Sequence, residues 1–353
     1  MKRTSTLLLI LFLFGFLPRS HAKGPEATGD NDIVLSREGN KTDNTYRIIY
    51  FLTESNKISV AQFLKEREQQ AKKLTHVIYF PSSIDIDIDE NEDIALSSAE
   101  MADWQALKDA ATIDGFKPMF GFHKNMDIIR RTLQHENSRT LLIQHIIELQ
   151  QMLKGAGIDF DIEYPSSASD TKLLGVFFNQ LRKAMSTNVL LSADVGPKSF
   201  TLSPLGHLEG NVINNSLDWI NLMSYGKGQN NGLQMMYSIV AEYARKHVDA
   251  RKMVIGLPFY AKAYYTDEAG EKKAFIPSYE YLVQHIGADD MYSDSLAFDK
   301  PGADPNYLLF NSPSIIEEKA KFARSYGGVM AWHWRDDVVG EHSLTGAIIR
   351  GKR

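Results

Sequence analysis

Three carboxylates lie two residues apart within one short apolar stretch of this chain. Residues 157–165 read Gly-Ile-Asp-Phe-Asp-Ile-Glu-Tyr-Pro, so Asp159, Asp161 and Glu163 alternate with apolar side chains. This alternation predicts a strand that carries all three acids on one face. Neighbouring carboxylates resist ionising together, so at least one pKa should rise. A carboxylic acid that stays protonated near neutral pH can donate to a leaving oxygen, as hydrolysis of a glycosidic bond requires.

An alternation of acids and apolar residues is also compatible with two less specific roles. The acids could form the solvated face of an edge strand, or their oxygens could bind a hard cation such as calcium or magnesium. The opposite face, however, is wholly apolar, with Ile158, Phe160 and Ile162. A strand that helices cover needs such a face. The acids then point into an enclosed space, which favours a barrel interior or a cleft.

The stretch resembles the signature D-G-x-D-x-D-x-E of glycoside hydrolase family 18, the chitinases and related endo-N-acetylglucosaminidases. Gly157, Asp159, Asp161 and Glu163 match this signature, whereas Ala156 replaces its leading Asp. Three later segments resemble the sixth, seventh and eighth strands of the family in the family's order. Residues 218–225 resemble the sixth-strand motif of the family, which ends in M-x-Y-D. Residues 256–260 match the first five positions of the seventh-strand motif G-x-P-F-Y-G-R, and residues 327–332 resemble the eighth-strand motif G-G-x-M-x-W.

Two departures from the family pattern concern the surroundings of the acids. The third strand of these enzymes ends in S-x-G-G, where this chain has Gly-Phe-His-Lys at residues 121–124. Asp159 must therefore be supported by another group, either His123 or a residue elsewhere. The Asp that follows the sixth-strand Tyr is Gly226 here. This second departure predicts open space beside the sugar next to the scissile bond, which an Asp at position 226 would fill.

The resemblance implies a catalytic role for four residues. Glu163 would protonate the glycosidic oxygen and later act as base for water. The acetamido group of the substrate, rather than a protein nucleophile, would attack the anomeric carbon, an exception to the usual two-carboxylate scheme. Asp161 would accept the acetamido N–H, Tyr225 would donate to its carbonyl oxygen, and Asp159 would share a proton with Asp161.

Substrate-binding residues follow from the same resemblance. Trp332 would form the floor of the sugar pocket because aromatic faces bind the apolar faces of sugar rings, and Met223, Tyr50 and Tyr260 would line it. No metal and no cofactor are expected, since the chain has neither an HExxH motif nor a pair of His at ligand spacing.

The elements that would position these residues alternate regularly along the chain. Eight strands and intervening helices predict an α/β fold, a (β/α)₈ TIM barrel, whose active site lies at the carboxyl ends of its strands. The alternative, a doubly wound open sheet, lacks a Gly-rich turn after the first strand. The strands are expected at 47–51, 75–80, 118–122, 158–163, 189–194, 219–225, 253–257 and 328–332, and helices at 60–74, 99–111, 140–153, 171–185 and 313–326. The long interval between the last two strands predicts a small α+β insertion at about 261–309.

The amino terminus has the composition of a secretory signal peptide. Lys2 and Arg3 precede an apolar run at residues 7–17, and Ala22 ends a small-residue cleavage pattern. We therefore expect a signal peptide at 1–22, a flexible polar leader at 23–44, a catalytic domain at 45–353, and a secreted or periplasmic location. The run is too short to span a bilayer, so no membrane anchor is expected.

The net charge limits the binding partners that the chain can have, and the absence of Cys limits its chemistry. Removal of the signal peptide would reduce the 39 basic side chains to 36 against 44 acidic ones, a formal net charge of −8. Nucleic acid and anionic membranes are then unfavourable partners. The chain has no Cys, which excludes disulfides, thiol catalysis and a lipid-modified Cys. We expect a monomer whose partner is an oligo- or polysaccharide that contains N-acetylglucosamine.

Three functions remain open at this point. The first is a chitinase-type hydrolase of β-1,4-linked N-acetylglucosamine, and the second is an endo-β-N-acetylglucosaminidase acting on glycoprotein or peptidoglycan glycans. The third is a sugar-binding, chitinase-like lectin, which is disfavoured because such proteins typically lose the acid, whereas Glu163 is present.

Overall fold

The computed structural model describes residues 46–55, 57–81, 96–226, 232–267, 269–286, 295–298 and 306–353. The predicted signal peptide (1–22) and leader (23–44) lie outside these ranges, so both stay predictions. Among the helices within them, none is long and apolar enough to cross a membrane.

Eight parallel strands form a closed barrel in the order β1-β12-β7-β6-β5-β4-β3-β2, which confirms the predicted (β/α)₈ fold. Each predicted strand is present. The barrel strands are β1 (Arg47–Thr53), β2 (His76–Phe80), β3 (Lys117–Asn125), β4 (Gly157–Glu163), β5 (Leu190–Val195), β6 (Trp219–Leu222), β7 (Met253–Pro258) and β12 (Gly328–Trp332).

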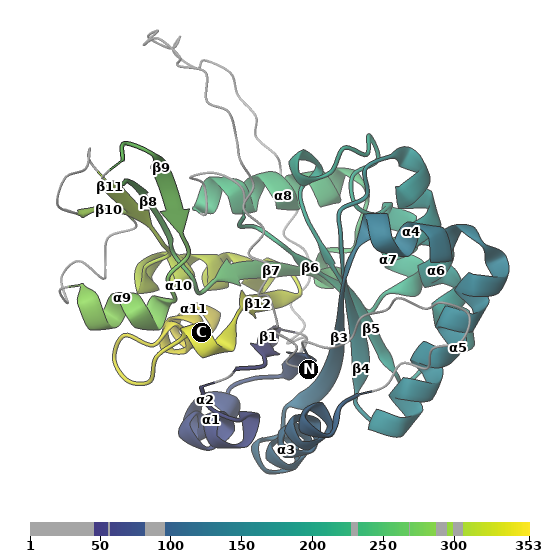
Figure 1. Ribbon diagram of the computed structural model, residues 1–353, viewed down its shortest axis with the longest axis horizontal. Helices are drawn as coiled ribbons and strands as arrows, with labels where there is room; N and C mark the ends of the chain where they lie inside the picture. Colours follow the sequence, from purple (N-terminus) through teal and green to yellow (C-terminus); the bar gives the residue numbers. More distant parts are fainter. Residues whose placement is uncertain are drawn as a thin grey trace, which may run out of the picture. The chain divides into compact units, whose positions relative to one another are not determined.

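Figure 1 shows the helices arranged around the outside of these strands. They are α1 (Val60–Glu66), α2 (Glu68–Ala71), α3 (Ser98–Asp114), α4 (Met126–Gln134), α5 (Glu136–Leu153), α6 (Ala168–Ala184), α7 (Gly210–Ser216), α8 (Leu233–Arg245), α10 (Pro313–Phe322) and α11 (Leu344–Lys352). Short 3₁₀ turns are η1 (Lys198–Phe200), η2 (Ala250–Lys252), η4 (Ala323–Ser325) and η5 (Trp334–Asp336).

Several predicted boundaries differ from the structure by a few residues, and two of the differences lie inside an expected element. The expected helix at 60–74 is interrupted at Arg67, whose backbone (φ −112°, ψ 14°) leaves the helical region and separates α1 from α2. The sixth strand ends at Leu222, so residues 223–225 continue from it without ladder pairing. The start of α10 is as expected, because the Ser312 side chain caps it and Pro313 occupies the first helical turn.

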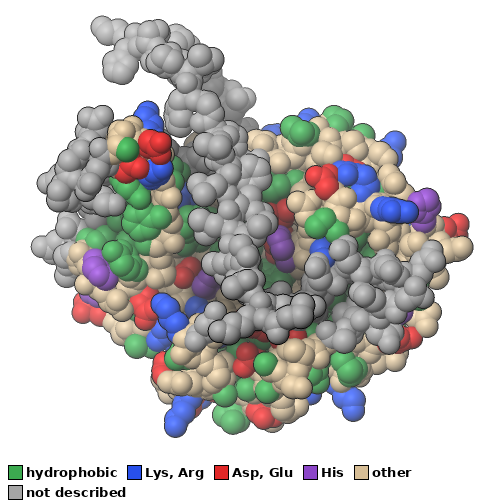
Figure 2. Space-filling view, viewed as in Figure 1, with side chains coloured by type: hydrophobic (Ala, Val, Ile, Leu, Met, Phe, Trp, Pro, Cys, Tyr) green, Lys and Arg blue, Asp and Glu red, His purple; other side chains and the backbone are tan. Residues whose placement is uncertain are grey.

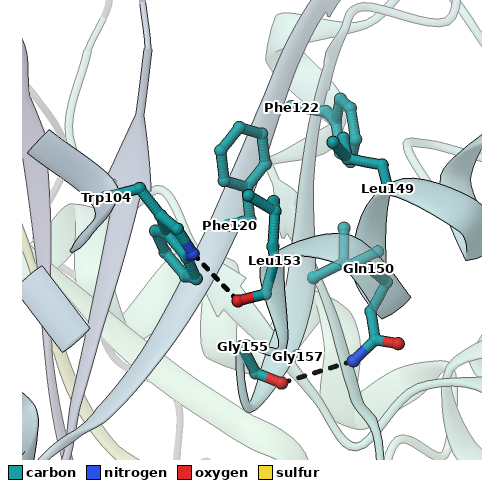
Figure 3. Close-up of a pocket in the computed structure, with 9 residues that line it drawn as sticks. Trp104, Phe120, Phe122, Leu149, Gln150, Leu153, Gly155 and Gly157 are labelled. Atoms are coloured by element: carbon teal, nitrogen blue, oxygen red, sulfur yellow. Dashed lines mark hydrogen bonds between the residues drawn. The ribbon is translucent and has the colours of Figure 1, made fainter. Parts of the chain in front are cut away.

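The layer between barrel and helices is apolar. Figure 3 shows part of it, where Trp104 of α3 and residues of α5 cover β3 and β4. The Trp104 indole N–H donates to the carbonyl oxygen of Leu153 at 3.0 Å, and the Gln150 amide donates to that of Gly155 at 3.3 Å. This packing lies outside the barrel wall and is therefore separate from the acidic face of β4.

Between β7 and β12 the chain forms a second, four-stranded antiparallel sheet in the order β10-β11-β8-β9. Figure 1 shows this sheet and α9 on the opposite side of the molecule from α4, α5 and α6. The elements are β8 (Lys262–Thr266), β9 (Lys272–Phe275), α9 (Tyr279–His285), β10 (Ser295–Phe298) and β11 (Asn306–Leu309).

Candidate active site

The three acids of β4 point into the barrel, as the alternation predicts. Asp159 is fully buried and Asp161 is 6% exposed, whereas Glu163, at the carboxyl end of the strand, is partly exposed. Ile158, Phe160 and Ile162 face the opposite way and belong to the core beneath the helices. Figure 2 shows acidic (red), basic (blue) and histidine (purple) side chains scattered over the face that it presents.

Asp159 is held by two other strands of the barrel, β5 and β6. The Ser192 hydroxyl donates to its Oδ1, and the Asn221 amide donates to the same oxygen at 3.1 Å. Burial raises the pKa of Asp159, the hydrogen bond from Ser192 opposes this rise, and the nearby charge of Asp161 adds to it. Asp159 therefore favours its protonated form.

Glu163 has the environment of a general acid. Burial, and next the charge of Asp161, raise the pKa of Glu163 to about 8, while a hydrogen bond with Tyr164 and the charge of His123 oppose the rise. Its carboxyl group is therefore protonated at neutral pH. Because the residue ends β4, it is the acid of the row closest to solvent.

The third strand supports a different acid from the one expected. A Cβ at Gly121 would lie 2.6 Å from the ring of Phe80, so this position has no room for the Ser of S-x-G-G. His123 does not support Asp159; its Nδ1 lies 2.9 Å from Oδ2 of Asp161. The support of Asp159 comes instead from Ser192 on the neighbouring strand β5.

Tyr225 and Met223 lie just beyond β6, facing the barrel interior. Both are nearly buried and belong to the inner apolar cluster. The Tyr225 hydroxyl lies 3.5 Å from the sulfur of Met330, and its ring meets that of Tyr260 edge-on at 6.0 Å. Burial, reinforced by the charge of Asp194, raises the pKa of Tyr225, so the phenol stays a proton donor.

Trp332 ends β12 and is half-buried against other rings of the barrel interior. Its ring lies 5.4 Å from that of Phe51 and 6.0 Å from that of Phe80. The peptide bonds Glu163–Tyr164 and Trp332–His333 are both cis. The indole is in contact with the same inner cluster that contains Met223 and Tyr225.

The prediction that Tyr50 lines the sugar pocket is wrong. Its side chain is fully buried on the helix side of the barrel wall, where its hydroxyl lies 2.8 Å from that of Thr345. Its ring meets Phe259 at 5.4 Å and Trp334 at 5.7 Å. Neighbours on a strand face opposite ways, so Ile49 and Phe51, on either side of Tyr50 in β1, face inward.

The open space expected at Gly226 is filled. A Cβ there would lie 2.8 Å from Cζ of Phe200, and the backbone φ of +123° is one that side-chain-bearing residues rarely adopt. The nearly buried Phe200 ring also meets the ring of Tyr164 at 5.7 Å. An apolar wall thus stands where family members place an Asp.

Asp194 is a further acid of the barrel interior, and it lies outside the motifs that the sequence shares with the family. It is 3% exposed, and its Oδ1 meets no hydrogen-bond donor in the described part of the chain. Burial, together with the charges of Asp159 and Asp161, raises the pKa of Asp194 well above its usual range. Its spacing of two from Ser192 could have placed it on the inner face.

Within the described ranges, no group of three or more His, Asp or Glu side chains is arranged to hold a metal ion. The groups that the structure brings together at this site are carboxyl, phenol and imidazole groups.

Comparisons with known proteins agree on the family. A model of the glycosyl hydrolases family 18 matches residues 47–337. A class V chitinase of Arabidopsis thaliana is 24% identical over 237 residues, 56% of this chain and 62% of that protein. Endochitinase 1 of Metarhizium robertsii is 25% identical over 234 residues, 54% of each protein. The chain thus spans less than two thirds of the length of the curated relatives that it matches.

Solved structures share the fold at low sequence identity. A chitinase from Bacteroides thetaiotaomicron has a TM-score of 0.67 at 19% identity, with 87% of this chain and 96% of that one covered. A class V chitinase from Nicotiana tobaccum, solved in complex with NAG4, has a TM-score of 0.68 at 17% identity and coverages of 87% and 98%. A chitinase-like agglutinin from Robinia pseudoacacia has a TM-score of 0.68 at 18% identity and coverages of 86% and 98%. Because the family model spans every strand of the barrel, this chain belongs to the glycosyl hydrolases family 18.

Proposed function

We propose that this protein is a retaining glycosidase that hydrolyses β-1,4-linked N-acetylglucosamine oligomers. The observation that carries the proposal is Glu163, a partly exposed carboxyl group that ends β4 with its pKa raised to about 8, beside Asp161. A protonated acid next to an anion is the pair that glycosidic cleavage with participation of the substrate requires.

The reaction begins with proton transfer from Glu163 to the glycosidic oxygen. As the bond between that oxygen and the anomeric carbon breaks, the acetamido carbonyl oxygen of the same sugar bonds to the anomeric carbon and forms an oxazolinium ion. Asp161 accepts the acetamido N–H and stabilises the positive charge. Tyr225 donates to the acetamido oxygen, and its raised pKa keeps that proton in place.

Water then completes the cycle. The Glu163 carboxylate takes a proton from water as the water oxygen attacks the anomeric carbon, and the oxazolinium ring opens. Two displacements at the same carbon give retention of configuration. Asp159, protonated and held by Ser192 and Asn221, lies next to Asp161 on the strand and shares its proton with it.

The binding surface in this proposal consists of Trp332, Met223 and Tyr260 around the carboxyl ends of the strands. The Trp332 ring would carry the sugar that bears the reacting acetamido group. Export is part of the same proposal: the predicted signal peptide at 1–22 would be removed, which mass spectrometry of the protein recovered outside the cytoplasm would detect.

Defined substrates test the activity. The protein is incubated with chitotetraose, with a high-mannose glycoprotein and with an oligomer of glucose, and the products are identified by mass. We expect cleavage of chitotetraose and none of the glucose oligomer, which has no acetamido group. Release of the glycan from the glycoprotein alone would assign the endo-β-N-acetylglucosaminidase activity instead, and binding of chitotetraose without cleavage would assign a lectin.

A further inference from the structure

His123 is the residue of the candidate site that the family pattern does not contain. It lies directly opposite Asp161 in the pairing of β3 with β4, and its Nδ1 is 2.9 Å from Oδ2 of that carboxyl group. Its side chain is 58% exposed, whereas that of Asp161 is 8% exposed. His123 therefore contacts a buried acid from the solvent side.

The two carboxyl oxygens of Asp161 have different environments. Oδ2 faces His123, whereas Oδ1 is buried and meets no donor with hydrogen-bond geometry in the described part of the chain. A contact that occupies one oxygen also fixes the direction of the other. Oδ1 is the oxygen left to accept the acetamido N–H of a substrate.

We propose that His123 is a positioning residue that, as an imidazolium, keeps the negative charge of the acidic row on Asp161 and orients its Oδ1. The inference rests on the function proposed above. Asp159 and Glu163, on either side, both favour their protonated forms because they are buried. A cation next to Asp161 favours the state in which Asp161 is ionised while Asp159 and Glu163 are protonated.

The surrounding charges support a protonated His123. The hydrogen bond with Asp161 raises the pKa of His123, and burial opposes this rise. The charges of Asp161 and Glu163 on β4 raise the pKa further, whereas the charge of Lys124 on β3 lowers it. Because the pKa is raised above 6.5, the imidazolium is present below that value and is lost as the pH increases through the raised one. Further groups act on Asp161 from other elements: Asp194 on β5 and His207 before α7.

Kinetics of two variants test the role of the charge. His123→Ala removes charge and donor, whereas His123→Asn keeps a neutral donor close to the position of Nδ1. At pH 5–6 we expect His123→Ala to lower kcat about 10- to 100-fold, the effect of one charge-assisted hydrogen bond, with little change in KM. The loss should shrink as the pH increases through the raised pKa of His123, because the wild type then loses the charge as well. His123→Asn should recover only part of the rate at pH 5–6.

A matched control is His135→Gln, a change of an exposed histidine at the junction of α4 and α5. It should leave the pH profile unchanged. A loss in His123→Ala that is the same factor at every pH would overturn the proposal, since a purely structural role predicts that result. Full recovery by His123→Asn at every pH would overturn the part played by the charge.

NMR on the resting protein separates this inference from the proposed function. The imidazole C2–H signal of His123 is assigned by its absence in His123→Asn and followed against pH in the wild type and in Asp161→Asn. The pKa of His123 should fall by at least about one pH unit in Asp161→Asn. An unchanged pKa overturns the pairing, even if chitotetraose is cleaved. A wild type that cleaves no chito-oligosaccharide refutes the proposed function, while the titration still decides the pairing.

Discussion

Glu163→Gln keeps the size and the hydrogen-bonding capacity of the side chain but removes the acidic proton. If Glu163 is the general acid, turnover of the best chito-oligosaccharide should fall by at least about 10²–10⁴-fold. Binding of the same oligosaccharide, measured by calorimetry, should remain. Near-wild-type turnover in a correctly folded variant would falsify the assignment of the acid.

Gly226→Asp tests the apolar wall beside the site. The structure predicts a loss of kcat/KM on chitotetraose, because the new Cβ would lie 2.8 Å from Phe200 and the φ of +123° disfavours any side chain. The double variant Gly226→Asp/Phe200→Ala should recover part of this loss, since only the contact with the ring is relieved. A rate above that of the wild type in the single variant would contradict this view of the wall.

Residue types and spacing were sufficient to identify the acidic row, because a strand has a strict period of two. They were not sufficient for Phe200, which follows a loop after β5 and reaches Gly226 only through tertiary packing. The contact of His123 with Asp161 could not be predicted for a similar reason. Register between β3 and β4 decides that His123 faces Asp161, and register is not visible in a single strand.

At the scale of elements, β1 and α11 are joined by the buried contact of Tyr50 with Thr345. Tyr50→Phe should lower the free energy of unfolding by about 0.5–1.5 kcal/mol, the usual net contribution of one hydrogen bond. It should leave kcat/KM on chitotetraose unchanged, because the ring lies outside the barrel wall. Chemical denaturation and steady-state kinetics on the same preparation check both parts. A rise in KM in this variant would indicate that Tyr50 contacts the sugar.

Most strands were predictable to within one or two residues because each is a short apolar run between amphipathic helices. The ends of elements were less predictable where tertiary contacts decide them. Arg67 interrupts the first helix while its guanidinium donates to the carbonyl oxygen of Asp337, a residue 270 positions away. The wrong prediction for Tyr50 has a similar cause, since the resemblance indicated the strand but not which of its two faces the ring occupies.

At the scale of the whole molecule, buried titratable groups of opposite kinds make stability depend on pH. Burial lowers the pKa of His76 to about 3 and that of His207 to about 4. Because the unfolded chain binds protons at these histidines more readily, their contribution to the free energy of unfolding is lost as the pH falls from 6.5 through these values. Burial raises the pKa of Asp336 to about 7 and that of Glu163 to about 8. The contribution of these acids is lost as the pH increases from their usual value, about 4, through the raised one. Above pH 6.5 the histidines no longer oppose this loss.

Melting temperatures measured between pH 6.5 and 8.5 should accordingly decrease as the pH increases. Asp336→Asn provides a control, because the amide cannot ionise and the decrease should become smaller. A melting temperature that increases steadily over this range would contradict the burial of these acids.

The pairing of β1 with β12 has a consequence for the order in which the protein can be made. The first strand of the barrel hydrogen-bonds to its last, with Arg47 opposite Gly328, so the ring of strands cannot close before β12 has left the ribosome. Contacts this distant in sequence form slowly. A nascent chain whose barrel stays open until β12 has been synthesised is suited to passage across a membrane as an extended polypeptide, which the proposed export would require. On the proposed route, closure of the barrel, and with it the juxtaposition of groups from β3, β4, β5 and β6 around the acids, would follow translocation.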